Sequence, residues 1–372
     1  MASVLYSPIV KGKLNDLKAL GHVSNQTRSI IKPMVEAMPL PKNGDIEKHI
    51  WRVAHYLVKH VPLGDLYLDF YGLTPGLKMP NGADAVTTGF RLVKKLGRTV
   101  TPSYGFGRDD SLWPMLRDVI SDQRQGFCFR LDVDDLDDQA EDTWAQILER
   151  SAQLVLKSDN IDLMIDLRDV GGADISEIKN VVLDFLDLIP SGSSYRSIAV
   201  AGSSALKTVG EIPKDGVDEI TRNELHLWSR LQRDLDTNID LVFGDYGVIH
   251  PDFSDQGPNK YMNAKIRYTN RGRITYFRGH ALSHPIKDYD QYYHLAAQVR
   301  DSPHYCGRPF SYGDWYIDMV ADGNLRHGSP GTWVLADMNH HLEYTAKQMP
   351  NLIEKIAEVG DEVELAELTD LA

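Results

Sequence analysis

Short apolar runs alternate with longer amphipathic stretches through the first two thirds of the chain. Each run has the length of a strand buried on both faces, and each stretch repeats its apolar positions with helical spacing. This alternation is typical of parallel strands connected by helical crossovers. We expect strands at residues 5–10, 30–37, 66–71, 99–106, 126–133, 161–167, 195–201 and 239–243.

The amphipathic stretches predict helices at residues 14–20, 46–61, 90–96, 109–120, 144–154, 178–188 and 219–235. Eight strands with helical crossovers in about 250 residues fit the usual size of a closed barrel. We therefore predict an α/β fold, a TIM-like (β/α)8 barrel, over residues 1–257. An open doubly wound sheet is the alternative, because it can be built from the same units.

The pattern changes after residue 258. Two strand-like runs, 265–268 and 273–278, flank the turn at residues 270–272 and predict a hairpin. Helices are expected at 289–300 and from His340 into the acidic tail, with an ordered, aromatic-rich loop region at 301–337 between them. No linker-like segment precedes this part, so we expect residues 258–372 to be a C-terminal extension packed on the barrel within the same domain.

Charge and composition limit the classes of binding partner and the cellular location that we expect. The net charge of -13 repels bulk nucleic acid and anionic membranes, which favours a small molecule or a protein as partner. Two cysteines are too few for a disulfide framework. There is no leader-like segment and no apolar run near the roughly 18 residues that a membrane span needs. We therefore expect a cytoplasmic protein with no membrane contact.

Polar side chains follow the predicted strands where these end. In a parallel barrel such side chains converge on one mouth. The candidate acids are Glu36, Asp69, Asp132, Asp166 and Asp245. The candidate ligand-binding residues are Lys11, Tyr104, Arg108, Arg130, Arg168, Ser203 and Tyr246.

Two interpretations of these side chains fit the spacing. In one, Arg130, Asp132, Asp166 and Arg168 form a salt-bridge network that closes the barrel without chemistry, because buried charges persist only when paired. In the other, the cations hold an anionic group such as phosphate. The acids then bind a divalent metal or move protons. The cofactor is thus unknown, with a divalent metal as the candidate.

Short motifs along nearly the whole chain carry a family resemblance. They are residues 6–13, 17–20, 32–36, 220–225, 244–246, 267–269, 278–279, 310–314, 333 and 339–342. These motifs resemble the phage beta protein family, including the beta protein of T-even phage. Because they lie inside such motifs, the resemblance supports Lys11, Glu36 and Asp245 as site residues. It also adds His341 to the catalytic candidates, and Arg278 and Asp314 to the ligand-binding ones.

The resemblance implies a role in the conflict between phages and their hosts, since members of the family occur in phages and in bacterial defence-associated loci. Two functional hypotheses follow. The favoured one is a phage or antiviral-defence component whose barrel binds a nucleotide, a nucleic-acid end or another protein of the system. The alternative is a metal-assisted, phosphodiesterase-like hydrolase acting on a phosphorylated substrate at the mouth. The first is favoured because no acid or histidine cluster has metal-ligand spacing.

Overall fold

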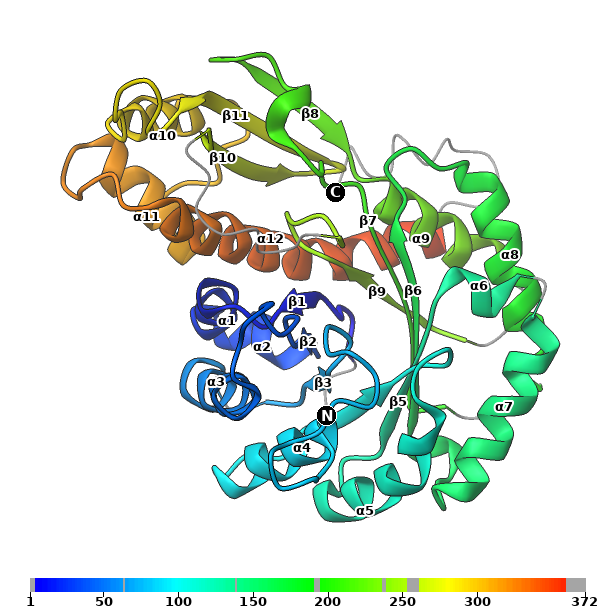
Figure 1. Cartoon of the computed structure of the whole chain (residues 1–372). Helices are drawn as coiled ribbons and strands as arrows, with labels where there is room; N and C mark the ends of the chain where they lie inside the picture. Colours follow the sequence, from blue (N-terminus) through cyan, green and yellow to red (C-terminus); the bar gives the residue numbers. More distant parts are fainter. Residues whose placement is uncertain are drawn as a thin grey trace.

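The computed structural model describes residues 4–62, 64–137, 139–190, 195–235, 239–252 and 261–358. Within them, eight parallel strands form one curved sheet with helices on its outer side (Figure 1). The strands, in order around the sheet, are β1 (Ile9–Lys11), β2 (Met34–Glu36), β3 (Tyr67–Asp69), β4 (Thr101–Tyr104), β5 (Phe127–Leu131), β6 (Ile161–Asp169), β7 (Ser197–Ser203) and β9 (Leu241–Asp245).

The residues just before β1 join the two ends of this sheet. Tyr6 forms parallel bridges with Ile31 and Phe243. The amide of Ser7 donates to the carbonyl oxygen of Phe243 at 2.7 Å. The ring therefore closes, which confirms the predicted TIM-like (β/α)8 barrel. The open doubly wound sheet is wrong, because its two edge strands would not meet.

Helices surround the ring. They are α1 (Leu14–Gly21), α2 (Asn25–Ile30), α3 (Ile46–His60), α4 (Ala85–Lys95), α5 (Trp113–Gln123), α6 (Val133–Leu136), α7 (Ala140–Gln153), α8 (Ile175–Asp187) and α9 (Asn223–Asp234), with single 3-10 turns η1 (Asp110–Leu112), η2 (Ser158–Asn160) and η3 (Val209–Glu211). Aspartates cap several of the helices, among them α3, α4 and α8. Asp45, Asp84 and Asp174 each accept a backbone N–H of the first turn, so the residue type fixes where these helices start.

A second, antiparallel sheet lies beside the barrel (Figure 1). The predicted hairpin is confirmed as β10 (Asn263–Asn270) and β11 (Arg273–Ala281). Its third strand, β8 (Val217–Thr221), pairs with β11. The helix predicted at 219–235 is therefore wrong in its first residues. The β-branched Val217, Ile220 and Thr221 suit a strand, and the distant β11 supplies the partner.

The loop region predicted at 301–337 is wrong. After α10 (Gln291–Arg300), the chain forms α11 (Tyr312–Ala321) and then α12 (Pro330–Glu358). Ser311 caps α11 by accepting the amide of Asp314 at 3.1 Å. Gly313 lets α11 cross α12 closely, because a Cβ there would lie 2.2 Å from the carbonyl oxygen of Ala336. The many Gly and aromatic residues thus serve helix packing.

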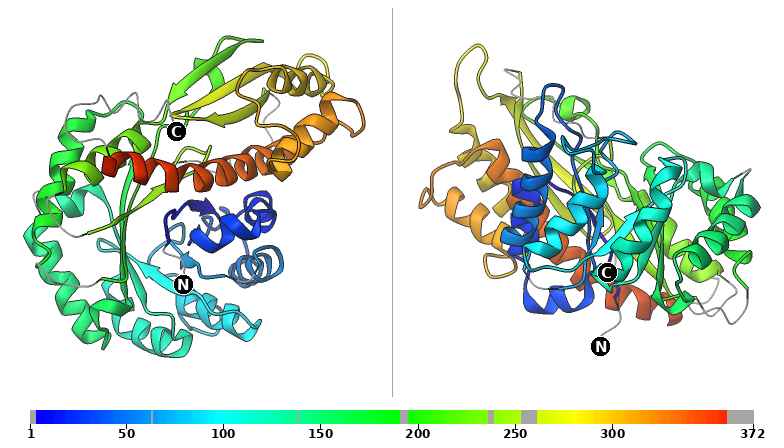
Figure 2. Two further views of the ribbon diagram at one scale, coloured as in Figure 1. Left: turned by 180° about the vertical axis from the view of Figure 1, so that it is seen from behind. Right: turned by 60° about the horizontal axis from the view of Figure 1, so that its bottom comes forward.

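Helix α12 passes from the second sheet to the barrel. Trp333 and Ala336 belong to the apolar cluster around the second sheet, α10 and α11. Met338, Leu342 and Met349 belong to the main core of the barrel. Figures 1 and 2 show the helix running past α1 to α9, so it takes the place of the eighth outer helix. The shared helix favours a single domain, which stays a prediction.

Two predictions lie partly outside the described residues: the boundary at residue 257 and the continuation of the last helix into the tail beyond residue 358. In the described part of the chain, no helix combines the length and the apolar character needed to cross a membrane.

Candidate functional site at the barrel mouth

The barrel interior changes from apolar to charged toward the carboxyl ends of the strands. Ile9, Met34, Tyr67, Cys128 and Met164 form one apolar layer. Two positions further along the same strands stand the buried residues Lys11, Glu36, Asp69, Arg130 and Asp166. Because side chains alternate along a strand, a spacing of two keeps the same face. The sequence therefore brings these five predicted site residues to one end of the ring.

Arg130 is the centre of this layer. Its guanidinium donates to Glu36 Oε2 at 2.7 Å, to Asp69 Oδ2 at 3.1 Å and to Asp166 Oδ2 at 2.7 Å. It also donates to the hydroxyl of Tyr246 at 3.0 Å, and that hydroxyl donates to Asp166 at 2.6 Å. Burial opposes the charge, but Tyr246 and the three acids raise the pKa of Arg130 well above its ordinary value.

Lys11 and Arg108 complete the pairing of the acids. Lys11 forms a salt bridge with Glu36 and donates to the carbonyl oxygen of Pro251 at 2.8 Å. Burial lowers the pKa of Lys11 although Glu36 opposes this. Arg108 holds both oxygens of Asp69, at 2.7 and 3.0 Å. Burial would raise the pKa of Asp69, but Arg108 and Arg130 outweigh it and the pKa falls.

One aromatic ring lies over three arginines. The guanidinium carbons of Arg130, Arg108 and Arg168 are 4.5, 4.9 and 5.1 Å from the ring centroid of Tyr71. Cations at this distance are attracted to the face of the ring. The residue is 42% exposed, so part of it remains in contact with solvent. Sequence analysis missed Tyr71 as a site residue, although it stands two positions after Asp69.

Arg168 lies at the solvent side of the cluster. Its backbone has a φ of 58°, in the left-handed region that side chains rarely adopt. Its amide donates to Asp166 at 3.1 Å and its guanidinium to Asp252 at 2.9 Å. The exposed Lys207 donates to the other oxygen of Asp252 at 3.2 Å. Strained backbone of this kind is concentrated at functional sites, which supports a role for Arg168.

We refer to the residues joined at this end of the barrel as the mouth cluster. They are Lys11, Glu36, Asp69, Tyr71, Arg108, Arg130, Asp166, Arg168 and Tyr246. Their charged groups pair with one another, as the salt-bridge interpretation expects, yet Arg108, Arg168 and Tyr71 still reach solvent.

Five other predicted site residues form their hydrogen bonds with groups outside the mouth cluster, so their role in the site stays a prediction. Asp132 is exposed and caps α6 by accepting the amide of Asp135 at 3.3 Å. Tyr104 is buried against Trp113, and the guanidinium of Arg108 lies 4.8 Å from its ring centroid, so Tyr104 borders the mouth cluster. The remaining three bind locally: Ser203 accepts the amide of Ala205, Arg278 donates to loop carbonyls, and Asp314 pairs with His340.

Asp245 and His341 meet in a different network, which we call the buried joint (Tyr6, Arg222, Asp245, Thr269, His341 and Thr345). The carboxylate of Asp245 bonds to His341 Nε2 at 2.7 Å, the Tyr6 hydroxyl at 2.6 Å and Arg222 at 3.1 Å. Both Asp245 and His341 are fully buried. Burial would raise the pKa of Asp245, but His341 and Arg222 hold it at about 2. The joint ties α12 to the barrel.

The acids of the mouth cluster are already occupied by cations. Within the described residues, no group of three or more His, Cys, Asp or Glu side chains is arranged to hold a metal ion. A metal placed between Glu36, Asp69 and Asp166 would have to displace the guanidinium of Arg130. The donor set therefore does not fit a divalent metal.

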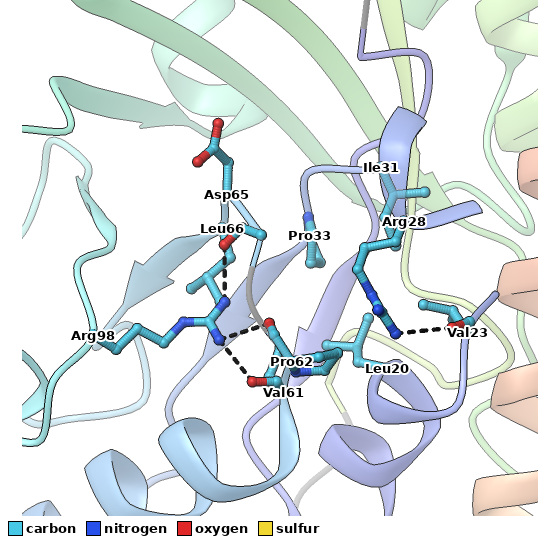
Figure 3. Close-up of a pocket in the computed structure, with 11 residues that line it drawn as sticks. Leu20, Val23, Arg28, Ile31, Pro33, Val61, Pro62, Asp65, Leu66 and Arg98 are labelled. Atoms are coloured by element: carbon cyan, nitrogen blue, oxygen red, sulfur yellow. Dashed lines mark hydrogen bonds between the residues drawn. The ribbon is translucent and has the colours of Figure 1, made fainter. Parts of the chain in front are cut away.

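A small pocket lies at the opposite end of the ring, near the amino ends of β2 and β3 (Figure 3). Its lining is mostly apolar. Arg98 is bonded to the carbonyl oxygens of Val61, Pro62 and Gly64, and Arg28 to that of Val23. Because both guanidiniums hold loop backbone, this pocket serves the structure of the amino end.

Family models provide the comparison that identifies the chain. The model described as Beta protein matches residues 6–347. The chain belongs to the Beta protein family. The match spans the barrel, the second sheet and most of α12, which confirms the family resemblance of the sequence motifs. The finer likeness to the T-even phage protein stays a prediction.

Solved structures resemble this Beta protein family member only distantly. A 3-hexulose-6-phosphate synthase shares 13% identity over 66% of this chain and 91% of its own, with a TM-score of 0.35. A triosephosphate isomerase from Bartonella henselae shares 10% over 64% and 91%, with a TM-score of 0.32. An octameric Rubisco from Pyrococcus horikoshii shares 12% over 67% and 56%, with a TM-score of 0.34. A search of curated proteins finds no match.

Proposed function

We propose that the barrel mouth binds a small anionic ligand of the nucleotide class, and that this binding serves a phage-encoded or antiphage-defence component in the cytoplasm. The observation that carries the proposal is the set of three guanidiniums around one half-exposed tyrosine ring. Family membership supports the phage–host part of the proposal.

The side chains that reach solvent have the chemistry for such a ligand. Guanidinium groups bond to phosphate through paired, charge-assisted hydrogen bonds, and Arg108 and Arg168 each keep part of their surface exposed. A nucleobase stacks on aromatic rings, and Tyr71 offers one beside them. Together they match a planar base joined to a phosphate.

The buried part of the mouth cluster would hold this surface in place. Arg130 fixes the position of Asp69 through a hydrogen bond. Asp69 in turn orients Arg108 through two hydrogen bonds. Asp166 orients the backbone of Arg168. A preorganised site loses less entropy when a ligand binds. The chain as a whole is acidic, so the local cations favour a small anion over long nucleic acid.

The metal-assisted hydrolase has less support. That mechanism needs carboxylates that are free to coordinate a metal or to accept a proton. Glu36, Asp69 and Asp166 are instead each bonded to Arg130.

The test is thermal unfolding with a panel of nucleotides, pyrophosphate, Mg²⁺ and Mn²⁺. A ligand of the folded state raises the unfolding midpoint. We expect a nucleotide to raise it for the wild type but not for Arg168→Gln. Arg300→Gln is the matched control, because Arg300 is a comparably exposed arginine that pairs with Asp322 at the ends of α10 and α11 and not with the mouth cluster. A shift from Mg²⁺ that disappears in Asp166→Ala, or a shift only from a protein partner, would contradict the proposal.

A further inference from the structure

The segment after β9 lies against the mouth cluster through several separate contacts. Lys11 donates to the carbonyl oxygen of Pro251 at 2.8 Å. His250 Nδ1 accepts the amide of Asp252 at 3.1 Å, so its Nε2 carries the proton and donates to Asp169, also at 3.1 Å. The buried His250 thus fixes the position of Asp252 at the rim.

The carboxylate of Asp252 is held by two cations. One oxygen accepts from Arg168 at 2.9 Å and the other from Lys207 at 3.2 Å. The hydrogen bond from Arg168 lowers the pKa of Asp252, so the group is ionised at neutral pH. Its side chain is about half exposed, and solvent reaches both sides of the bridge.

A terminal phosphate would accept hydrogen bonds from Arg168 and Lys207 in the same way as the Asp252 carboxylate does. A phosphate presents two oxygens with the spread of a carboxylate and carries more negative charge. Arg168 also lies over Tyr71, so the bridge adjoins the ring on which a base would stack.

We infer that the space between Arg168 and Lys207 is the subsite for the terminal phosphate of the ligand, and that Asp252 is an internal anion which the phosphate displaces. The inference rests on the proposed function and deepens it. The inference predicts that the wild-type protein binds its ligand more weakly than the same site would without the Asp252 carboxylate, because the ligand competes with this tethered group.

The experiment is calorimetric titration of the full chain with inorganic pyrophosphate at low salt. Asp252→Asn removes the competing charge and keeps the shape, so we expect it to bind pyrophosphate up to about fivefold more tightly than the wild type, the size of one exposed ion pair. Lys207→Gln in the same background should remove this gain. Asp322→Asn breaks the comparable Arg300–Asp322 pair and should change nothing.

Succinate distinguishes the two sources of a dianion. We expect succinate to bind wild type and Asp252→Asn more weakly than pyrophosphate does. Succinate and pyrophosphate binding with equal affinity would overturn the assignment to phosphate. If wild type binds pyrophosphate and Asp252→Asn binds it no more tightly, the inference fails and the proposed function stands. If neither protein binds pyrophosphate or any nucleotide, both fail.

Discussion

The mouth cluster and the buried joint both link arginine, aspartate and tyrosine side chains but differ in their access to solvent. In the joint, Arg222, Asp245 and His341 are all buried, and Arg222 and His341 both bond to the carboxylate of Asp245. In the mouth cluster, Arg130 is equally buried, while Arg168 and Tyr71 reach the surface. Partial exposure is what allows a charge to exchange its partner for a ligand. We therefore propose that the joint is structural and that the mouth binds the ligand.

The largest expected effect comes from breaking the joint. Arg222→Leu would leave Asp245 and Glu224 buried without their cation. Removing one partner of a buried ion pair costs about 3–5 kcal/mol. Urea unfolding should show a loss of this size in the free energy of unfolding. A loss below about 1 kcal/mol would show that the joint does not stabilise the fold.

Acid should weaken the joint next. The pKa of Asp245 is about 2 in the folded chain and about 3.9 when unfolded, so its stabilisation is complete above pH 4–5 and is lost as the pH falls to 2. Nearly two pKa units correspond to about 2.6 kcal/mol, of which about 2 kcal/mol is lost between pH 5 and pH 2. The gap in unfolding free energy between wild type and Asp245→Asn should narrow by this amount between pH 5 and pH 2. A constant gap would contradict the assigned pKa.

Two other buried acids should respond to acid in the opposite direction. Asp16 on α1 and Asp337 on α12 each have one buried oxygen without a hydrogen-bond partner, and burial raises the pKa of each to about 6. A raised carboxyl pKa costs stability above pH 6 and returns it as the pH falls. The gain in unfolding free energy of Asp16→Asn over wild type should therefore be about 1.4 kcal/mol larger at pH 7.5 than at pH 5. An equal effect at both pH values would point to packing instead.

The smallest stability effect should come from the mouth. Arg168→Gln removes a partly exposed ion pair, which is worth about 1 kcal/mol or less. Its urea midpoint should stay close to that of Arg300→Gln, while its nucleotide affinity falls. A stability loss as large as that of Arg222→Leu would mean that the mouth cluster is a structural network like the joint.

The location of the mouth was predictable from local sequence, because charged residues follow apolar runs at the ends of strands. This placed Lys11, Glu36, Asp69, Arg130 and Asp166 correctly at one end of the barrel. Asp132 shows the limit of that rule. It stands one residue after β5, where a carboxylate caps the next helix instead of facing the mouth.

The remaining errors come from contacts between distant segments. Strand β8 forms because β11 pairs with it. The β-branched residues of 217–221 suit a strand, but no local pattern shows that β11 is its partner. Tyr71 is the last residue of the predicted strand 66–71, and nothing local shows that three arginines from other loops and strands lie against its ring. Asp252 and Lys207 meet across 45 positions of sequence.

The central claim is that the mouth cations bind the phosphate of a nucleotide. The most direct measurement is calorimetric titration with the four ribonucleoside 5′-monophosphates and the corresponding nucleosides. We predict that at least one monophosphate binds about tenfold or more tightly than its nucleoside, as expected for charge-assisted hydrogen bonds worth roughly 1.5–3 kcal/mol. This difference should disappear in Arg168→Gln. Equal binding of nucleotide and nucleoside, or a difference that survives in the variant, would contradict the claim.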